Sequence, residues 1–100
     1  MVQATTPTFV LTLPNTVDLS IAQNIYFSIE QGQVKMMKTG TDLSVDGQNV
    51  SVYFSQAETL QFKEGNALIQ LNWTYPDGSR ACTFIKSIPV GKNLINEVLE

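Results

Sequence analysis

The 100-residue sequence contains no histidine, a single cysteine and only 15% charged residues. The absence of histidine removes the commonest catalytic base and the commonest transition-metal ligand. The lone Cys82 excludes an internal disulfide and lacks the second thiolate that a structural zinc site needs. No base, nucleophile or metal-ligand set is left. We therefore expect a protein that is not an enzyme and that has no catalytic residue, cofactor, metal or small-molecule substrate.

Positive charge and long apolar runs are also scarce. Six Lys and Arg residues are spread between Lys35 and Lys92, and the net charge is −3, so we expect no nucleic-acid partner. No segment approaches the roughly 20 apolar residues of a membrane span, so we expect no membrane partner. The first eight residues carry neither positive charge nor an apolar run. We therefore expect no signal peptide and synthesis in the cytosol.

Three X-Gly pairs separate stretches in which apolar and polar residues alternate: Gln31-Gly32, Asp46-Gly47 and Asp77-Gly78. Such pairs supply the positive φ angles of tight hairpin turns. Each turn predicts a register that places apolar residues opposite one another. The expected pairs are Ile29 with Val34, Phe27 with Met36, Leu43 with Val50, Trp73 with Cys82, and Leu71 with Phe84.

The alternation predicts an all-β fold, an immunoglobulin-like antiparallel sandwich of about seven strands. We expect one domain over residues 1–100, with a flexible lead-in over residues 1–7. The predicted strands are Thr8–Leu13, Asn24–Glu30, Gln33–Thr39, Asp42–Val45, Asn49–Phe54, Ala67–Tyr75 and Arg80–Ile88.

Two short helices are expected outside the strands. Ser55 and Glu58 match a capping box, which predicts one helical turn ending near Leu60. Asn93 is a possible cap for a helical tail over residues 92–100. The apolar stripe of this tail, formed by Leu94, Ile95, Val98 and Leu99, must cover either its own domain or a partner subunit.

Two tyrosines are expected on outer strand faces and are candidates for partner binding. Tyr26 and Tyr53 alternate with apolar neighbours that point inward. Trp73 and Cys82 are expected in the core instead. With the four apolar tail residues, the two tyrosines make up the partner-binding candidates. A carbohydrate-binding module that uses Tyr26, Tyr53 or Trp73 is the alternative function.

Several segments resemble the small β domains of tailed-phage and prophage structural proteins from Gram-positive bacteria, above all the N-terminal domains of baseplate upper proteins. They extend from Phe9 to about Val90 and consist mainly of strand alternation and turns. The resembling stretches are Phe9–Pro14, Asp18–Ser20, Ile25–Gly32, Val50–Leu60 and Ile69–Arg80.

The resemblance implies an immunoglobulin-like sandwich that assembles into a virion part such as a tail or baseplate. In that family the domain usually precedes a receptor-binding region, and no such region follows within these 100 residues. The expected function is therefore that of a non-enzymatic structural or assembly protein. The resemblance implies a virion component, made in the bacterial cytoplasm, that self-associates or contacts other virion proteins. No catalytic residue is carried over from the family.

Overall fold

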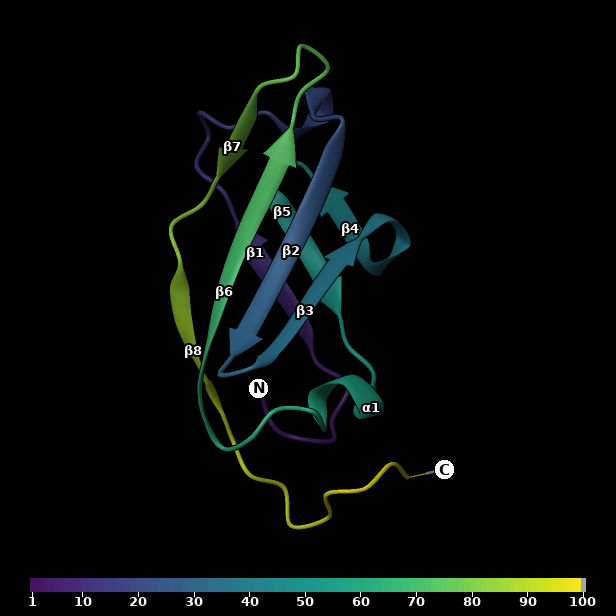
Figure 1. Ribbon diagram of the computed structural model, residues 1–100. Coiled ribbons are helices and arrows are strands. Elements are labelled where there is room, and N and C mark those ends of the chain that lie inside the picture. Colours follow the sequence, from purple (N-terminus) through teal and green to yellow (C-terminus); the bar gives the residue numbers. More distant parts are fainter. Residues whose placement is uncertain (100) are drawn as a thin grey trace.

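The computed structural model describes residues 1–99 and consists of two antiparallel β-sheets (Figure 1). The smaller sheet has the order β1-β5-β4, with β1 at Thr8–Thr12, β5 at Asn49–Tyr53 and β4 at Leu43–Asp46. The larger sheet runs β3-β2-β6, and both β7 and β8 pair with the far edge of β6. Its strands are β2 at Asn24–Gln31, β3 at Val34–Thr39, β6 at Gly65–Thr74, β7 at Arg80–Cys82 and β8 at Lys86–Val90. The all-β prediction is confirmed, with eight strands in the described part of the chain.

Three short helical turns carry the chain between the sheets. The 3₁₀ turn η1, Leu19–Ile21, connects β1 to β2, and η2, Gly40–Asp42, connects β3 to β4. The single α-helical turn α1, Gln56–Thr59, connects β5 to β6. Its capping box is present as predicted. Ser55 Oγ accepts from the Glu58 backbone N–H at 3.2 Å, and Glu58 Oε1 accepts from the Ser55 N–H at 2.8 Å.

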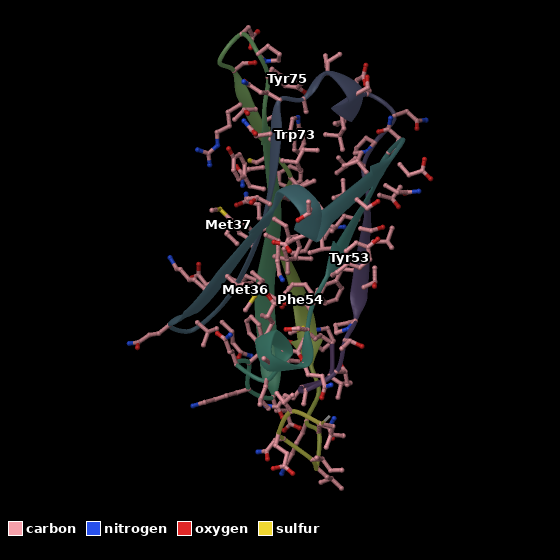
Figure 2. All side chains as sticks on the ribbon, turned by 90° about the vertical axis from the view of Figure 1, so that its right-hand side faces the viewer. Met36, Met37, Tyr53, Phe54, Trp73 and Tyr75 are labelled. Atoms are coloured by element: carbon pink, nitrogen blue, oxygen red, sulfur yellow. The ribbon has the colours of Figure 1, made fainter. Side chains whose placement is uncertain are left out.

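The core lies between the inner faces of the two sheets. β5 contributes Val50 and Val52, whereas β2 contributes Phe27 and Ile29, and all four are buried. β6 adds four alternate buried residues: Ala67, Ile69, Leu71 and Trp73. Figure 2 shows the layers from the side, with Met37 pointing outward and Met36 and Phe54 directed between the sheets. The predicted alternation of inner and outer residues is thus confirmed for these strands.

Two of the predicted hairpin registers are displaced by two residues. Ile29 lies opposite Met36 rather than Val34, and Val50 lies opposite Val45 rather than Leu43. Because side chains alternate with a period of two, this displacement changes the partners but keeps each side chain on its predicted face.

The N-terminal residues lie beside Gly91, which follows β8. Val2 forms an isolated parallel bridge with Gly91, whose N–H donates to Met1 O at 2.6 Å. The Gln3 N–H in turn donates to Gly91 O at 2.9 Å. Residues 1–3, within the predicted flexible lead-in, thus form defined backbone contacts.

The predicted C-terminal helix is wrong for residues 92–99, which contain only bends and irregular backbone. Asn93 does act as a local cap, because its Oδ1 accepts from the Ile95 N–H at 3.1 Å. No second turn packs the predicted apolar stripe against the sheets, and an isolated turn is not stable by itself. Glu100 lies outside the described residues.

Candidate interaction surfaces

The edge of the larger sheet contains a β-bulge between β7 and β8. Asn72 pairs with Cys82, and Ile69 pairs with Lys86. Two residues of β6 therefore oppose three residues on the edge, which are Thr83, Phe84 and Ile85. One extra residue on one strand is the defining feature of a bulge.

Side chains hold this bulge in place. The Thr83 N–H donates to Leu71 O at 2.9 Å, while Thr83 Oγ1 accepts from the Leu71 N–H at 3.1 Å. The hydroxyl thus takes the place of a ladder carbonyl. Gln70 Nε2 donates to the freed Thr83 carbonyl at 3.0 Å. The backbone groups of Thr83 and the Leu71 N–H are therefore satisfied at the bulge.

The turn between β6 and β7 explains why the predicted register of this hairpin is wrong. The Tyr75 N–H donates to Ser79 O at 2.9 Å, so the loop contains three residues, 76–78, rather than the predicted two. Trp73 lies opposite Ala81, not Cys82, and the Leu71 N–H bonds to Thr83, not to Phe84. The slip is one residue, so it moves each side chain of β7 to the other face. Cys82, predicted in the core, is consequently exposed.

Two neighbouring apolar side chains project from the bulge. Phe84 is 92% exposed and Ile85 is 61% exposed. Leaving a phenylalanine this exposed forgoes about 2 kcal/mol of burial free energy. We call Phe84 and Ile85 the bulge patch. An apolar pair at a bulged edge is a feature of surfaces that contact other proteins.

Polar contacts fix the tail over residues 92–99 to the domain. Asn93 Nδ2 donates to Gln3 O at 3.0 Å, and Gln56 of α1 bonds both the N–H and the carbonyl of Leu99 at 2.9 and 3.1 Å. The four candidate residues Leu94, Ile95, Val98 and Leu99 are all at least half exposed, and Leu94 is 91% exposed. Half or more of each of these apolar residues therefore remains exposed.

The two candidate tyrosines lie in different layers. Tyr53 is in β5 of the smaller sheet and is 47% exposed, whereas the half-buried Tyr26 is in β2 of the larger sheet. Each alternates with buried neighbours, so the two point to opposite outer faces. Trp73 is buried, as predicted, and its Nε1 donates to Tyr75 Oη at 2.8 Å. These aromatic side chains do not combine into one stacking platform.

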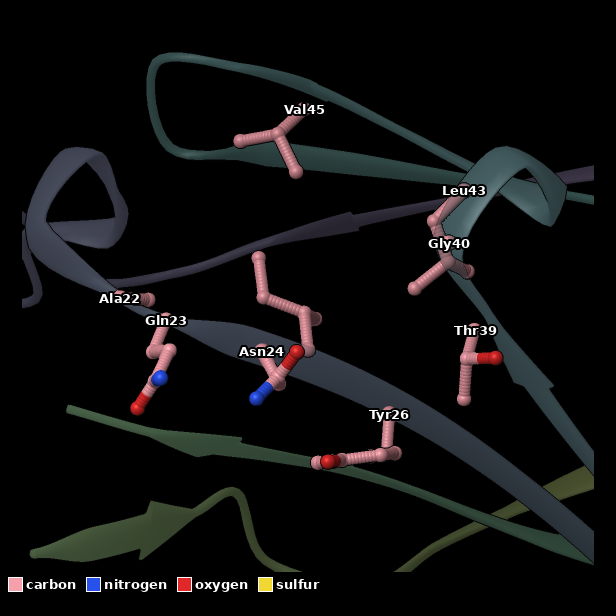
Figure 3. A pocket seen from close by; sticks show the side chains of 9 residues that line it. Ala22, Gln23, Asn24, Tyr26, Thr39, Gly40, Leu43 and Val45 are labelled. Atoms are coloured by element: carbon pink, nitrogen blue, oxygen red, sulfur yellow. The ribbon is translucent and has the colours of Figure 1, made fainter. Parts of the chain in front are cut away.

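A shallow crevice lies beside β2 and β4. It has a volume of about 490 Å³. Its lining includes Ala22, Gln23, Asn24, Ile25, Tyr26, Thr39, Gly40, Leu43 and Val45 (Figure 3). The lining contains no ionisable group other than the Tyr26 phenol. The crevice thus offers apolar and uncharged polar contacts, without a set of charged groups that would select a ligand.

Two aspartates, Asp18 and Asp77, stabilise local turns through their hydrogen bonds. Asp18 and Asp77 each accept from a serine two residues on, Ser20 and Ser79, and these hydrogen bonds lower the pKa of both carboxyls. No group of three or more His, Cys, Asp or Glu residues is close enough to hold a metal ion within residues 1–99. Both aspartates therefore act as turn residues.

Lys38 is a buried charge that the sequence reading missed. It lies on the inner face of the edge strand β3, only 4% exposed, and forms an ion pair with Glu58 of α1. Its ammonium also lies 4.9 Å from the centre of the Phe54 ring. Burial raises the pKa of Glu58, but hydrogen bonds from Lys38 and Ser55 outweigh this effect and keep the pKa below its ordinary value. The sequence pattern could have indicated this burial, because Lys38 continues the alternating series of inward residues that includes Val34 and Met36.

Comparisons with known proteins returned no matching family, no similar curated protein and no similar solved structure. Among the described residues, no helix is long and apolar enough to span a bilayer.

Proposed function

We propose that this chain is a non-enzymatic structural or assembly protein of a phage or prophage, associated with a tail or baseplate, that acts through protein–protein contacts. The observation that carries this proposal is the bulge patch. Phe84 is 92% exposed at a bulge that is held by specific hydrogen bonds from Thr83 and Gln70. A fixed apolar side chain at a sheet edge gains its burial free energy when a partner covers it.

The order of the strands supports the finer proposal of an immunoglobulin-like sandwich. Immunoglobulin domains have strands B-E-D in one sheet and C′-C-F-G in the other, and the orders β1-β5-β4 and β3-β2-β6-β7/β8 match this arrangement. Strand A is represented here only by the bridge between Val2 and Gly91. The inter-sheet disulfide of antibody domains is missing, since Cys82 is the only cysteine.

The proposed phage origin also rests on a second observation, the resemblance of residues 9–90 to the small β domains of tailed-phage structural proteins. Such domains act by assembly and carry no catalytic groups. The exposed apolar residues of the tail fit the same role, because they offer a second contact that the domain does not cover itself.

A particle-incorporation experiment tests the proposal. Tagged protein is produced in the cells that encode it, tailed particles are induced, and the particles are isolated by density-gradient sedimentation. We expect the native chain in the particle fraction and expect a double variant, Phe84→Ser with Ile85→Ser, to be depleted from it. Met37→Ser is the matched control, since Met37 is 62% exposed on the outer face of the same sheet. Equal incorporation of the double variant would rule out the bulge patch as the contact, and absence of the native chain from particles would rule out the virion role.

A further inference from the structure

The strand β1 has a free edge whose backbone groups point in a known direction. At the ends of its pairing with β5, the Leu13 N–H donates to Gln48 O at 2.8 Å and the Phe54 N–H donates to Pro7 O at 3.2 Å. In an antiparallel pair, hydrogen-bonded residues alternate along the strand. Pro7, Phe9, Leu11 and Leu13 therefore direct their backbone groups toward β5. Thr8, Val10 and Thr12 direct their N–H and C=O groups away from the sheet.

The other edges of the two sheets carry features that oppose strand addition. β3 has the exposed Lys35 and the inward charge of Lys38, and the β7–β8 edge has the bulge and Pro89. β4 spans four residues and ends in Asp46. Short length, charge, proline and bulges are the means by which natural sheets prevent edge pairing.

β1 has none of these features. Its sequence, Thr-Phe-Val-Leu-Thr, contains no charge, proline, glycine or bulge, and Val10 at its centre is 59% exposed. Figure 1 shows β1 at the side of the rear sheet, opposite β4. This is therefore the one edge, within residues 1–99, that is fit to receive another strand.

We propose that the β1 edge pairs with the β1 edge of a second copy of this chain, antiparallel, about a two-fold axis through Val10. The proposal extends the proposed function by naming a second copy as a partner, and it uses a surface separate from the bulge patch. The merged six-stranded sheet has the order β4-β5-β1 followed by β1-β5-β4 of the second copy.

The occupant is a second copy because the edge is complementary to itself. A two-fold axis at Val10 places Val10 opposite Val10 and Thr8 opposite Thr12 of the other copy. These are the residues whose backbone groups point outward, so each such pair can exchange both of its hydrogen bonds. This axis therefore pairs all three outward-directed residues within β1, whereas an axis at Phe9 or Leu11 would pair only two of the three within the strand.

The side chains suit the same pairing. On the outer face, valine meets valine and threonine meets threonine, which are favourable cross-strand pairs. On the inner face, Phe9 meets Leu11 of the other copy. No charged residue lies on β1 or β5, so the two copies do not bring like charges together along this seam. Tyr53, which pairs with Thr8, lies one strand from the seam on its outer face.

The experiment uses sedimentation velocity on the full chain from micromolar to millimolar concentration. Five-residue edges bury less surface than a standard interface, so we expect reversible, concentration-dependent dimers. Val10→Pro removes an N–H that points to the open edge and none that bonds β5, and edge strands tolerate such a proline. Each of the two copies loses one Val10 N–H, so the dimer loses two hydrogen bonds of about 1 kcal/mol each at the axis. This loss predicts an increase of about 30-fold in the dissociation constant of the dimer.

A charge variant and its control check the geometry without a proline. Val10→Lys places two lysines beside each other at the axis and should also weaken the dimer. Ser44→Lys is the matched control, because Val10, Ser51 and Ser44 lie in one row of the same outer face, with Ser44 on the far edge. We expect Ser44→Lys to dimerise as the native chain does.

Amide hydrogen exchange of the native chain gives a readout that does not depend on variants. The Thr8, Val10 and Thr12 N–H groups should become protected as concentration rises, while those of β3 should not. A native chain that stays monomeric to millimolar concentration would overturn the proposal. So would a dimer that Val10→Lys leaves unchanged. Neither result would change the expected incorporation of the native chain into particles through the bulge patch. Failure of this inference is therefore distinguishable from failure of the proposed function.

Discussion

The buried ion pair between Lys38 and Glu58 predicts that two single substitutions differ sharply in cost. The Lys38 side chain is 5% exposed, whereas that of Glu58 is 30% exposed. Glu58→Gln keeps an oxygen that can accept from the Ser55 N–H, so the capping box survives. It leaves the ammonium of Lys38 buried with only the Phe54 ring beside it. Removing one partner in this way typically destabilises a protein by about 3 kcal/mol.

Lys38→Met should cost much less. Methionine has a similar volume and fills the same inner position, and the carboxylate of Glu58 can be hydrated because it is partly exposed. We expect a loss of about 1 kcal/mol, the value of one hydrogen bond. The double variant should resemble Lys38→Met, because no buried charge then remains.

Urea unfolding at pH 7 followed by fluorescence measures this difference, and the single, buried Trp73 is a convenient probe. In thermal unfolding, each 1 kcal/mol should lower the midpoint of a domain of this size by about 4–8 °C. If Lys38→Met were as damaging as Glu58→Gln, or if the two losses simply added, the reasoning from unequal burial would be refuted.

Three further results follow from the same structure. The pKa of Glu58 is lowered in the folded chain, so its contribution to stability is full above the ordinary pKa of 4.5 and is lost as the pH falls through the lower, folded pKa. Unfolding midpoints measured over a pH series should show this loss of stability in the native chain and a smaller loss in Lys38→Met. Thr83→Val leaves the Leu71 N–H unpaired and should cost about 1–3 kcal/mol in urea unfolding, whereas Thr83→Ser should recover most of it, and equal losses would argue against the hydroxyl contact. Cys82 should react with a thiol reagent in the folded protein at a rate close to that in urea, and strong protection would contradict the observed register.

Strand positions and buried faces could be predicted from the sequence because both depend on local alternation. β2, β5 and β6 bury the predicted residues, since period-two patterns determine a face whichever partner strand is chosen. The capping box of α1 was equally local, because Ser55 and Glu58 satisfy each other within four residues.

The rest depended on distant contacts. The bulge requires Thr83 to bond Leu71 and Gln70, a combination that alternation along one strand does not encode. The tail prediction failed for a related reason. Asn93 made its local hydrogen bond to Ile95, but no neighbouring element covers the apolar residues that follow, and packing is what stabilises a short helix.

The exposure of the candidate partner-binding residues was predicted in part. Tyr53 and the apolar tail residues are exposed, whereas Tyr26 is half-buried. The bulge patch was missed because the predicted register placed Phe84 opposite Leu71 in the core. The free edge of β1 was missed because it depends on which strands border the sheet, and strand order is a property of the assembled fold.

Quantitative mass spectrometry of purified tailed particles, with and without the bulge-patch substitutions, tests the central claim most directly. The account predicts that the native chain is present in a fixed ratio to the other particle proteins and that the Phe84→Ser, Ile85→Ser variant is lost from them while remaining folded. Finding the native chain only among slowly sedimenting proteins, with none in the particles, would contradict it.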